Sequence, residues 1–133
     1  MKLQTKRCLL GALALASLSG LNTYALGMGP MILKERSGSL IISNQSDKSI
    51  RVFVNAYPVN LNDDVRAPAD QPYSKEKQRE IVYIQKSLFR VRKGGFKTIK
   101  YRILSTKNST PFYVCSRSIQ GSFSTRVCSL WEG

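Results

Sequence analysis

Two segments of the chain alternate regularly between apolar and polar residues. In residues 50–57 every second residue is apolar, and the shared face would consist of Ile50, Val52, Val54 and Ala56. In residues 96–104 the apolar face would consist of Ile99, Tyr101 and Ile103. A period of two is typical of a strand with one buried face, so both segments are predicted to be strands that line a core.

Shorter apolar runs predict further strands at residues 31–33, 39–43, 80–84 and 88–92, with two more in residues 112–131. Residues 58–79 carry three prolines and three aspartates, which interrupt any period, and are predicted to form a long surface loop. Their one helical possibility, residues 74–79, is too short to matter. About seven short strands with turns between them, and no convincing helix, predict an all-β fold: an antiparallel sandwich of immunoglobulin type.

The last two strands are predicted to form a hairpin on Gly121-Ser122. A glycine at the first loop position suits a type II′ turn. Counting outward from the turn places Cys115 opposite Cys128 and Arg117 opposite Arg126. Residues in opposite positions have Cβ atoms roughly 4.5–5.5 Å apart, which permits a cross-strand disulfide. The alternative is an ordinary hairpin with two unrelated thiols.

Residues 1–25 are predicted to be a cleaved secretory signal. Lys2, Lys6 and Arg7 precede an apolar run that is too short to span a bilayer, and Thr23-Tyr24-Ala25 is an acceptable cleavage site. Cleavage would remove Cys8 and leave the two hairpin cysteines in an oxidising compartment, which favours the disulfide. The localisation expected from such a signal is the periplasm.

Loss of the three signal charges would lower the net charge from +13 to +10. A basic chain suits nucleic acid, an anionic surface or an acidic polypeptide, and export makes nucleic acid the least suitable partner. Histidine is absent, which removes histidine-based catalysis and zinc sites of the HExxH type. The sequence also lacks a metal-ligand cluster and a phosphate-binding loop, so neither an enzyme nor a cofactor or metal is expected.

Several of these segments together resemble a known family. The order is a signal, GMGPMIL, SLIISNQSDKSIRVFV, a long loop, SLFRVRKGGFKTIKYRI, and then FYVC and RVCSLW. Over roughly residues 28–131 this order is similar to the N-terminal domain of the periplasmic pilus chaperones, the partners of outer-membrane ushers. The resemblance implies an immunoglobulin-like domain over residues 26–133, with the family's second domain absent.

The resemblance also implies a function, namely binding unfolded pilus subunits by lending them an edge strand. The lent strand would be residues 122–131, with Phe123, Val127 and Ile119 as the available apolar inserts. Strand addition satisfies the exposed backbone groups of the subunit while alternate side chains fill its groove. Some family members carry a disulfide between their last two strands, in agreement with the pairing of Cys115 and Cys128.

The family anchors the terminal carboxylate of the subunit on one basic residue of the first strand and one of the last. The candidates here are Lys34 and Arg36 on the first strand and Arg126, with Arg117 beside it, on the last. Two departures are that Glu132-Gly133 replaces the family's Arg-Pro pair and that the predicted donor strand has few large apolar residues. The alternative function is a secreted basic immunoglobulin-like module for adhesion or anion binding.

Overall fold

A computed structural model of the chain describes residues 26–62, 64–104, 110–120 and 123–133. Within these ranges the chain forms ten strands and one short helix. The predicted signal, residues 1–25, and the turn at residues 121–122 lie outside them. The elements are β1 (Leu26–Gly29), β2 (Ile32–Leu33), β3 (Ser37–Asn44), β4 (Ile50–Asn62), β5 (Val65–Pro68), α2 (Lys75–Ile81), β6 (Val82–Ile84), β7 (Leu88–Val91), β8 (Phe96–Ile103), β9 (Phe112–Gln120) and β10 (Phe123–Trp131).

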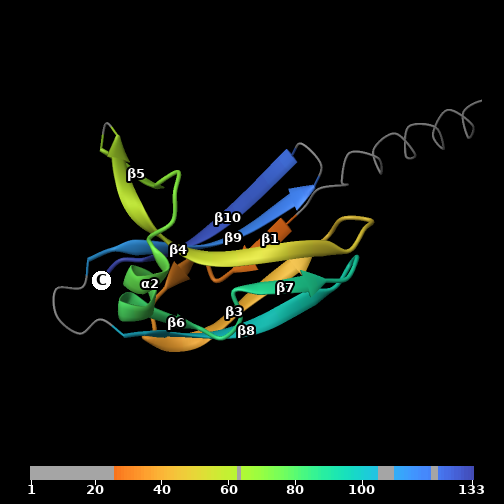
Figure 1. The fold of residues 1–133 in the computed structure, drawn as a ribbon, viewed down its shortest axis with the longest axis horizontal. Coiled ribbons are helices and arrows are strands. Elements are labelled where there is room, and N and C mark those ends of the chain that lie inside the picture. Colours follow the sequence, from red (N-terminus) through yellow and green to blue (C-terminus); the bar gives the residue numbers. More distant parts are fainter. Residues whose placement is uncertain (1–25, 63, 105–109, 121–122) are drawn as a thin grey trace, which may run out of the picture.

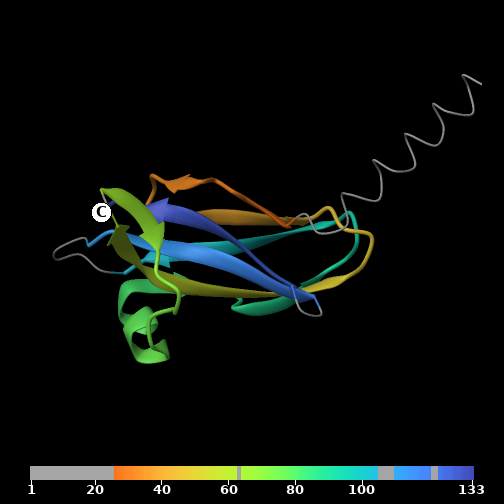
Figure 2. The same cartoon turned by 90° about the horizontal axis from the view of Figure 1, so that it is seen from above.

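The strands form two sheets that face each other, as predicted (Figures 1 and 2). The four-stranded sheet has the order β1-β3-β8-β6, and the six-stranded sheet has the order β2-β10-β9-β4-β5, with β7 also paired to β4. All pairings are antiparallel except β2 with β10, which is parallel. The chain leaves the first sheet after β1, passes Gly29-Pro30 and joins the second sheet as β2. This change of sheet is one reason why there are more strands than the predicted seven.

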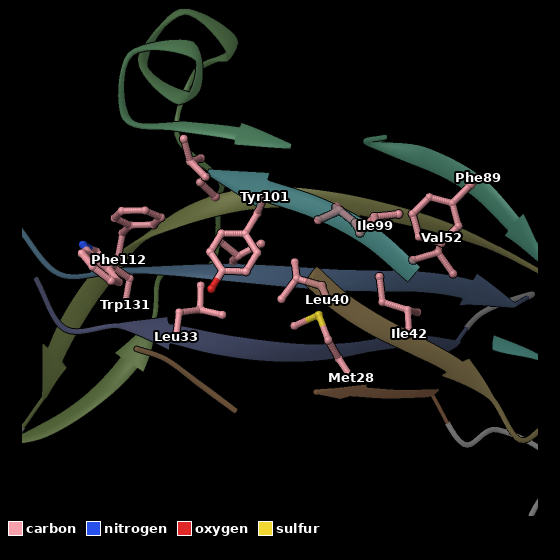
Figure 3. Close-up of a cluster of buried hydrophobic side chains, with 14 of the residues drawn as sticks. Met28, Leu33, Leu40, Ile42, Val52, Phe89, Ile99, Tyr101, Phe112 and Trp131 are labelled. Carbon is pink, nitrogen blue, oxygen red and sulfur yellow. The ribbon is translucent and has the colours of Figure 1, made fainter. Parts of the chain in front are cut away.

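The core lies between the sheets and contains both predicted apolar faces. Ile50, Val52, Val54 and Ala56 of β4 are at most 4% exposed, and the inward row of β8 is equally buried. Figure 3 shows side chains from both sheets meeting in this space, with Met28 and Leu33 contributed by the two halves of the first strand segment. The hydroxyl of Tyr101 donates a hydrogen bond to the carbonyl of Glu35 at 3.0 Å. Burial, together with the charge of Glu35, raises the pKa of Tyr101.

The prediction of a long surface loop at residues 58–79 is wrong, because strands and a helix occupy most of this segment. β4 continues through Pro58 to Asn62 and turns back into β5, and this hairpin projects from the sandwich (Figure 1). Helix α2 follows, and the side chain of Ser74 caps it by accepting from the Lys77 backbone N–H at 3.2 Å. The strand predicted at residues 80–84 is correspondingly shorter and begins at Val82.

Gln78 attaches helix α2 to the sheet. Its side chain accepts a hydrogen bond from the Ala56 backbone N–H at 3.0 Å and donates one to the Tyr73 carbonyl at 2.8 Å. No residue of the helix is buried. These polar contacts, together with Ile81, which packs against the core from the end of the helix, hold α2 beside β4.

The polar turn after β3 is anchored by the fully buried Asn44. Its side-chain amide donates to the carbonyls of Lys48 at 2.7 Å and Val91 at 3.1 Å, while its oxygen accepts from the Ser46 backbone N–H at 3.0 Å. One side chain thereby connects the β3–β4 turn to the end of β7. A tight turn also joins β7 to β8, with Gly94 at a φ of 66° and the Gly95 N–H donating to the Arg92 carbonyl at 2.9 Å.

Candidate functional site: the free edge of β10

On one side of the six-stranded sheet, other segments of the chain occupy the outer side of β4. Along the outer side of β4, residues 50–53 pair with β7 and residues 59–62 pair with β5. Between them, Val54 N–H donates to the Ser87 carbonyl at 2.8 Å and Ala56 N–H donates to Gln78. The edge strands on this side are therefore β5 and β7, each four residues long, with no described strand on their outer sides. A partner would find only short stretches of unpaired backbone there.

The opposite edge, at β10, is closed only at one end. β2 pairs with Leu130 and Trp131, and the Leu130 N–H donates to the Met31 carbonyl at 2.9 Å. Backbone groups of successive residues in a strand point to opposite sides, so those of Ser124, Arg126 and Cys128 point away from β9 as Leu130 does. No described strand pairs with residues 123–129 on that side.

The disulfide supports this assignment of the backbone groups. Cys115 and Cys128 lie opposite each other in the β9–β10 register, and their Cα atoms are 4.0 Å apart. Such a short separation is characteristic of a pair that does not exchange backbone hydrogen bonds, where Cα atoms lie about 4.5 Å apart. The N–H and C=O of Cys128 must then point away from β9. The predicted disulfide is present, with an S–S distance of 2.04 Å.

The disulfide belongs to a small apolar cluster on the outer face of the six-stranded sheet. Tyr57, Tyr113 and Cys115 are buried there, and Val59, Cys128 and Leu130 pack against them. The cluster crosses β4, β9 and β10, so it fixes the position of β10 from the side opposite the main core.

Arg117 and Arg126 face each other across β9 and β10, as predicted, and each has its own contact. Nε of Arg117 donates to the Ser124 hydroxyl at 2.9 Å. The guanidinium of Arg126 stacks on Tyr57, 5.0 Å from the ring centroid, and Nη1 donates to the Ala69 carbonyl at 2.8 Å. These contacts separate two like charges and hold Arg126 against the outer cluster.

Lys34 and Arg36 follow β2 and are exposed. The parallel register pairs Leu33 with Trp131, so Lys34 lies level with residue 132. Arg126 is six residues back along β10, about 20 Å at the usual rise of a strand. The structure therefore brings Arg117 and Arg126 together but does not bring either close to the first-strand candidates.

The three predicted apolar inserts do not share one row. Phe123 and Val127 lie on the row of β10 that faces the space between the sheets. Phe123 is 65% exposed, whereas Val127 packs against the core. Ile119 is 51% exposed and lies on β9, on the outer face beside Arg117.

Ser118 is a residue of this region that the sequence analysis missed. It is only 4% exposed, and its hydroxyl has no hydrogen-bond partner among the described residues. It lines a cavity of about 10 Å³ between the sheets, together with Leu26, Phe123 and Thr125. Its position could have been inferred from the sequence, because Ser118 comes two residues after Ser116 and therefore lies on the same buried row of β9.

The described residues contain neither a cluster of metal-ligand residues nor a helix that could span a membrane. They contain no group of three or more histidine, cysteine, aspartate or glutamate residues placed to hold an ion. None of their helices has the length and apolar character needed to cross a membrane.

The fold is the immunoglobulin-like fold of pilus-assembly chaperones. No family model and no curated protein matches the sequence. Among solved structures, the Pseudomonas aeruginosa CupB2 chaperone matches 79% of this chain at 16% identity, with a TM-score of 0.56. The E. coli chaperone DraB matches 82% at 13% identity, also with a TM-score of 0.56.

A structure of the Salmonella enterica SafA pilin in complex with the SafB chaperone gives a similar match, 81% of this chain at 14% identity and a TM-score of 0.56. The matches cover 53%, 54% and 53% of those three chains, so this chain spans about half their length. At these identities the similarity concerns the fold.

Proposed function

We propose that this chain is the subunit-binding domain of a periplasmic pilus chaperone, exported by a signal at residues 1–25. It binds unfolded pilus subunits by lending them residues 123–128 of β10, and it delivers them to an outer-membrane usher. The observation that carries this proposal is the free backbone edge of β10 in a fold shared with pilus chaperones. The neighbour in which a pilin is bound to a chaperone gives further support.

The geometry defines what the incoming strand meets. The N–H and C=O groups of Ser124, Arg126 and Cys128 are available for a ladder, and pairing stops where β2 occupies Leu130. Backbone pairing of this kind provides affinity, and side chains on alternate positions provide specificity. An exposed strand edge on a subunit is prone to aggregation, so covering it keeps the subunit soluble.

Phe123 and Val127 are the proposed inserts, because they lie on the row of β10 that faces the space between the sheets, from which alternate side chains of a lent strand can enter the groove of the subunit. Phe123→Ser is expected to weaken binding of a pilus subunit about tenfold, since a large exposed ring would lose its burial in the complex. Ile119→Ser is the matched control, because it removes a similarly exposed apolar side chain from the outer face of β9. Equal losses for the two variants would contradict the assignment of the insert row.

Arg126, with Arg117 beside it, is the proposed anchor for the carboxylate of the subunit, on the outer face of the β9–β10 hairpin. Lys34 and Arg36 could bind a carboxylate only at the Trp131 end of β10. Charge-assisted hydrogen bonds to a carboxylate are worth about 1.5–3 kcal/mol each, so Arg126→Ala should weaken subunit binding about tenfold or more. Lys34→Ala is tested beside it, and unchanged binding by both variants would remove the anchor assignment.

Co-isolation with a pilus subunit from a periplasmic extract tests the proposed function as a whole. The chain is expected to bind the subunit and to slow its aggregation. Salt titration separates this role from that of a basic anion-binding module, because exposed ionic contacts weaken steeply with salt. A strand-lending chaperone should keep most of its affinity at high salt, and a loss in proportion to ionic strength would favour the anion-binding module.

A further inference from the structure

A cleft of about 400 Å³ opens on the side of the sandwich opposite the free edge of β10. It lies between β6, the middle of β4 and helix α2. A volume of this size is sufficient for a small organic ligand. The residues that line it are Val54, Asn55, Lys75, Gln78, Arg79, Val82, Tyr83, Ile84, Ser87 and Leu104.

The helix makes the rim of this cleft cationic. Lys75 and Arg79 are four residues apart on α2 and both line the cleft. Neither has an ion-pair partner among the described residues, and no acidic residue is among those that line the cleft. Lys77 and Glu80, which do not line it, form an ion pair at 3.9 Å. The helix therefore presents to the cleft two positive charges that form no ion pair with a described residue.

Part of the lining of the cleft is apolar. Val54 and Val82 belong to the main core, and Ile84 packs against it. These side chains come from the edges of both sheets, at the point where the two sheets separate. A compact apolar group placed in the cleft would extend the core.

The free side of β6 adds a backbone site. Gln85 N–H donates to the Lys100 carbonyl, and the Leu104 N–H donates to the Ile81 carbonyl, so the groups of residues 81, 83 and 85 point toward β8. The N–H and C=O of Ile84 then point to the opposite side, where no described strand pairs with β6. They can pair with one amide of a ligand.

We propose that this cleft binds a small carboxylate that carries a compact apolar group and an adjacent amide, as an N-acylated apolar amino acid does. The carboxylate lies between Lys75 and Arg79, the apolar group contacts Val82, and the amide pairs with Ile84. The same chemistry occurs in a free metabolite and at the end of a peptide chain. The site is independent of strand lending, because it lies at the opposite edge of the sandwich.

A titration of the ¹⁵N-labelled chain with N-acetyl-L-phenylalanine, followed by NMR, tests this proposal. The expected result is saturable shifts of the Gln78, Val82 and Ile84 amide signals. N-acetyl-L-phenylalaninamide, which lacks the carboxylate, should bind at least about tenfold more weakly, because it cannot form charge-assisted bonds. Equal affinity for the acid and the amide, or shifts that map elsewhere, would overturn the proposal.

Two variants locate the carboxylate. Lys75→Gln combined with Arg79→Gln should weaken binding of the acid at least about tenfold, whereas Lys77→Gln, on the same helix but outside the cleft, should leave it unchanged. An equal effect of Lys77→Gln would show a response to net charge and would overturn the site. The unperturbed spectrum of each variant checks that the fold is intact.

A final comparison decides whether the natural ligand is the end of a peptide chain or a free metabolite. It measures the affinity for N-acetyl-L-phenylalanine and for the peptide Gly-Gly-Gly-Phe with a free carboxylate. Tighter binding of the peptide supports a chain end as the ligand, and tighter binding of the acylated amino acid supports a metabolite. Absence of binding by both compounds would overturn the proposal.

Discussion

Removal of the Cys115–Cys128 disulfide should lower the free energy of unfolding by about 3 kcal/mol. The two cysteines are separated by 13 positions in the sequence. A cross-link that closes a loop of roughly this length reduces the entropy of the unfolded chain by an amount worth about 3 kcal/mol at 25 °C. For a domain of about 100 residues, that loss corresponds to a decrease in Tm of roughly 10–25 °C.

The assay is urea unfolding followed by fluorescence of Trp131, the single tryptophan of the chain, which is 7% exposed at the end of β10. Two variants separate the cross-link from packing, namely Cys115→Ala with Cys128→Ala, and Cys115→Val with Cys128→Val. The valine variant fills the outer cluster but lacks the covalent bond. Both should lose about 3 kcal/mol, and the alanine variant should lose slightly more.

A loss below about 1 kcal/mol in both variants would refute this reasoning, because it would mean that the hairpin already persists in the unfolded chain. A normal stability of the valine variant alone would show that packing in the cluster, and not the cross-link, provides the stabilisation.

Two further predictions concern the polar contacts of the fold. Asn44→Ala should cost about 2–4 kcal/mol in urea unfolding, because it leaves the Val91 carbonyl and the Ser46 N–H without their buried partner, while the exposed Gln45→Ala should change stability by less than about 0.5 kcal/mol. The free energy of unfolding should also fall at alkaline pH, because burial raises the pKa of Tyr101 in the folded state. Above about pH 10 the unfolded chain loses the Tyr101 hydroxyl proton first, so the free energy of unfolding declines as the pH rises through the folded pKa. The decline from about pH 9 to 12 should be smaller in Tyr101→Phe, and an identical decline would contradict it.

Much of the sandwich could be predicted because alternation along a strand is a local property. The inward rows of β4 and β8 follow from the period of two in residues 50–57 and 96–104. The β9–β10 register follows from counting outward from Gly121-Ser122, and it placed both the cysteines and the arginines correctly opposite each other. Each of these predictions depends on residues that are close in the sequence.

The course of the chain after Pro58 could not be predicted in this way. A proline normally argues against a continuing strand, because it has no N–H to donate to the ladder. Here the Pro58 carbonyl accepts from the Ala69 N–H, so its backbone groups lie on the β5 side and the missing N–H does not interrupt pairing with β9. Only the three-dimensional arrangement reveals which side that is.

Helix α2 and the surroundings of Arg126 were missed for a related reason. The helix is short and mostly polar, and its attachment depends on contacts of Gln78 with Ala56 and Tyr73 and on packing of Ile81 against the core. Arg126 could be placed opposite Arg117, but its contacts with Tyr57 and the Ala69 carbonyl join residues more than 50 positions apart. Alternation in the sequence carries no information about such distant pairs.

Amide hydrogen exchange along β10 tests most directly whether this strand has a free edge that a partner can complete. In the free chain, the amides of Ser124, Arg126 and Cys128 should exchange rapidly, and those of Thr125, Val127 and Ser129, which point toward β9, should be protected. Addition of a pilus subunit should then protect the first three amides. Equal protection of both sets in the free chain, or rapid exchange of the first set in a complex with a bound subunit, would contradict the account.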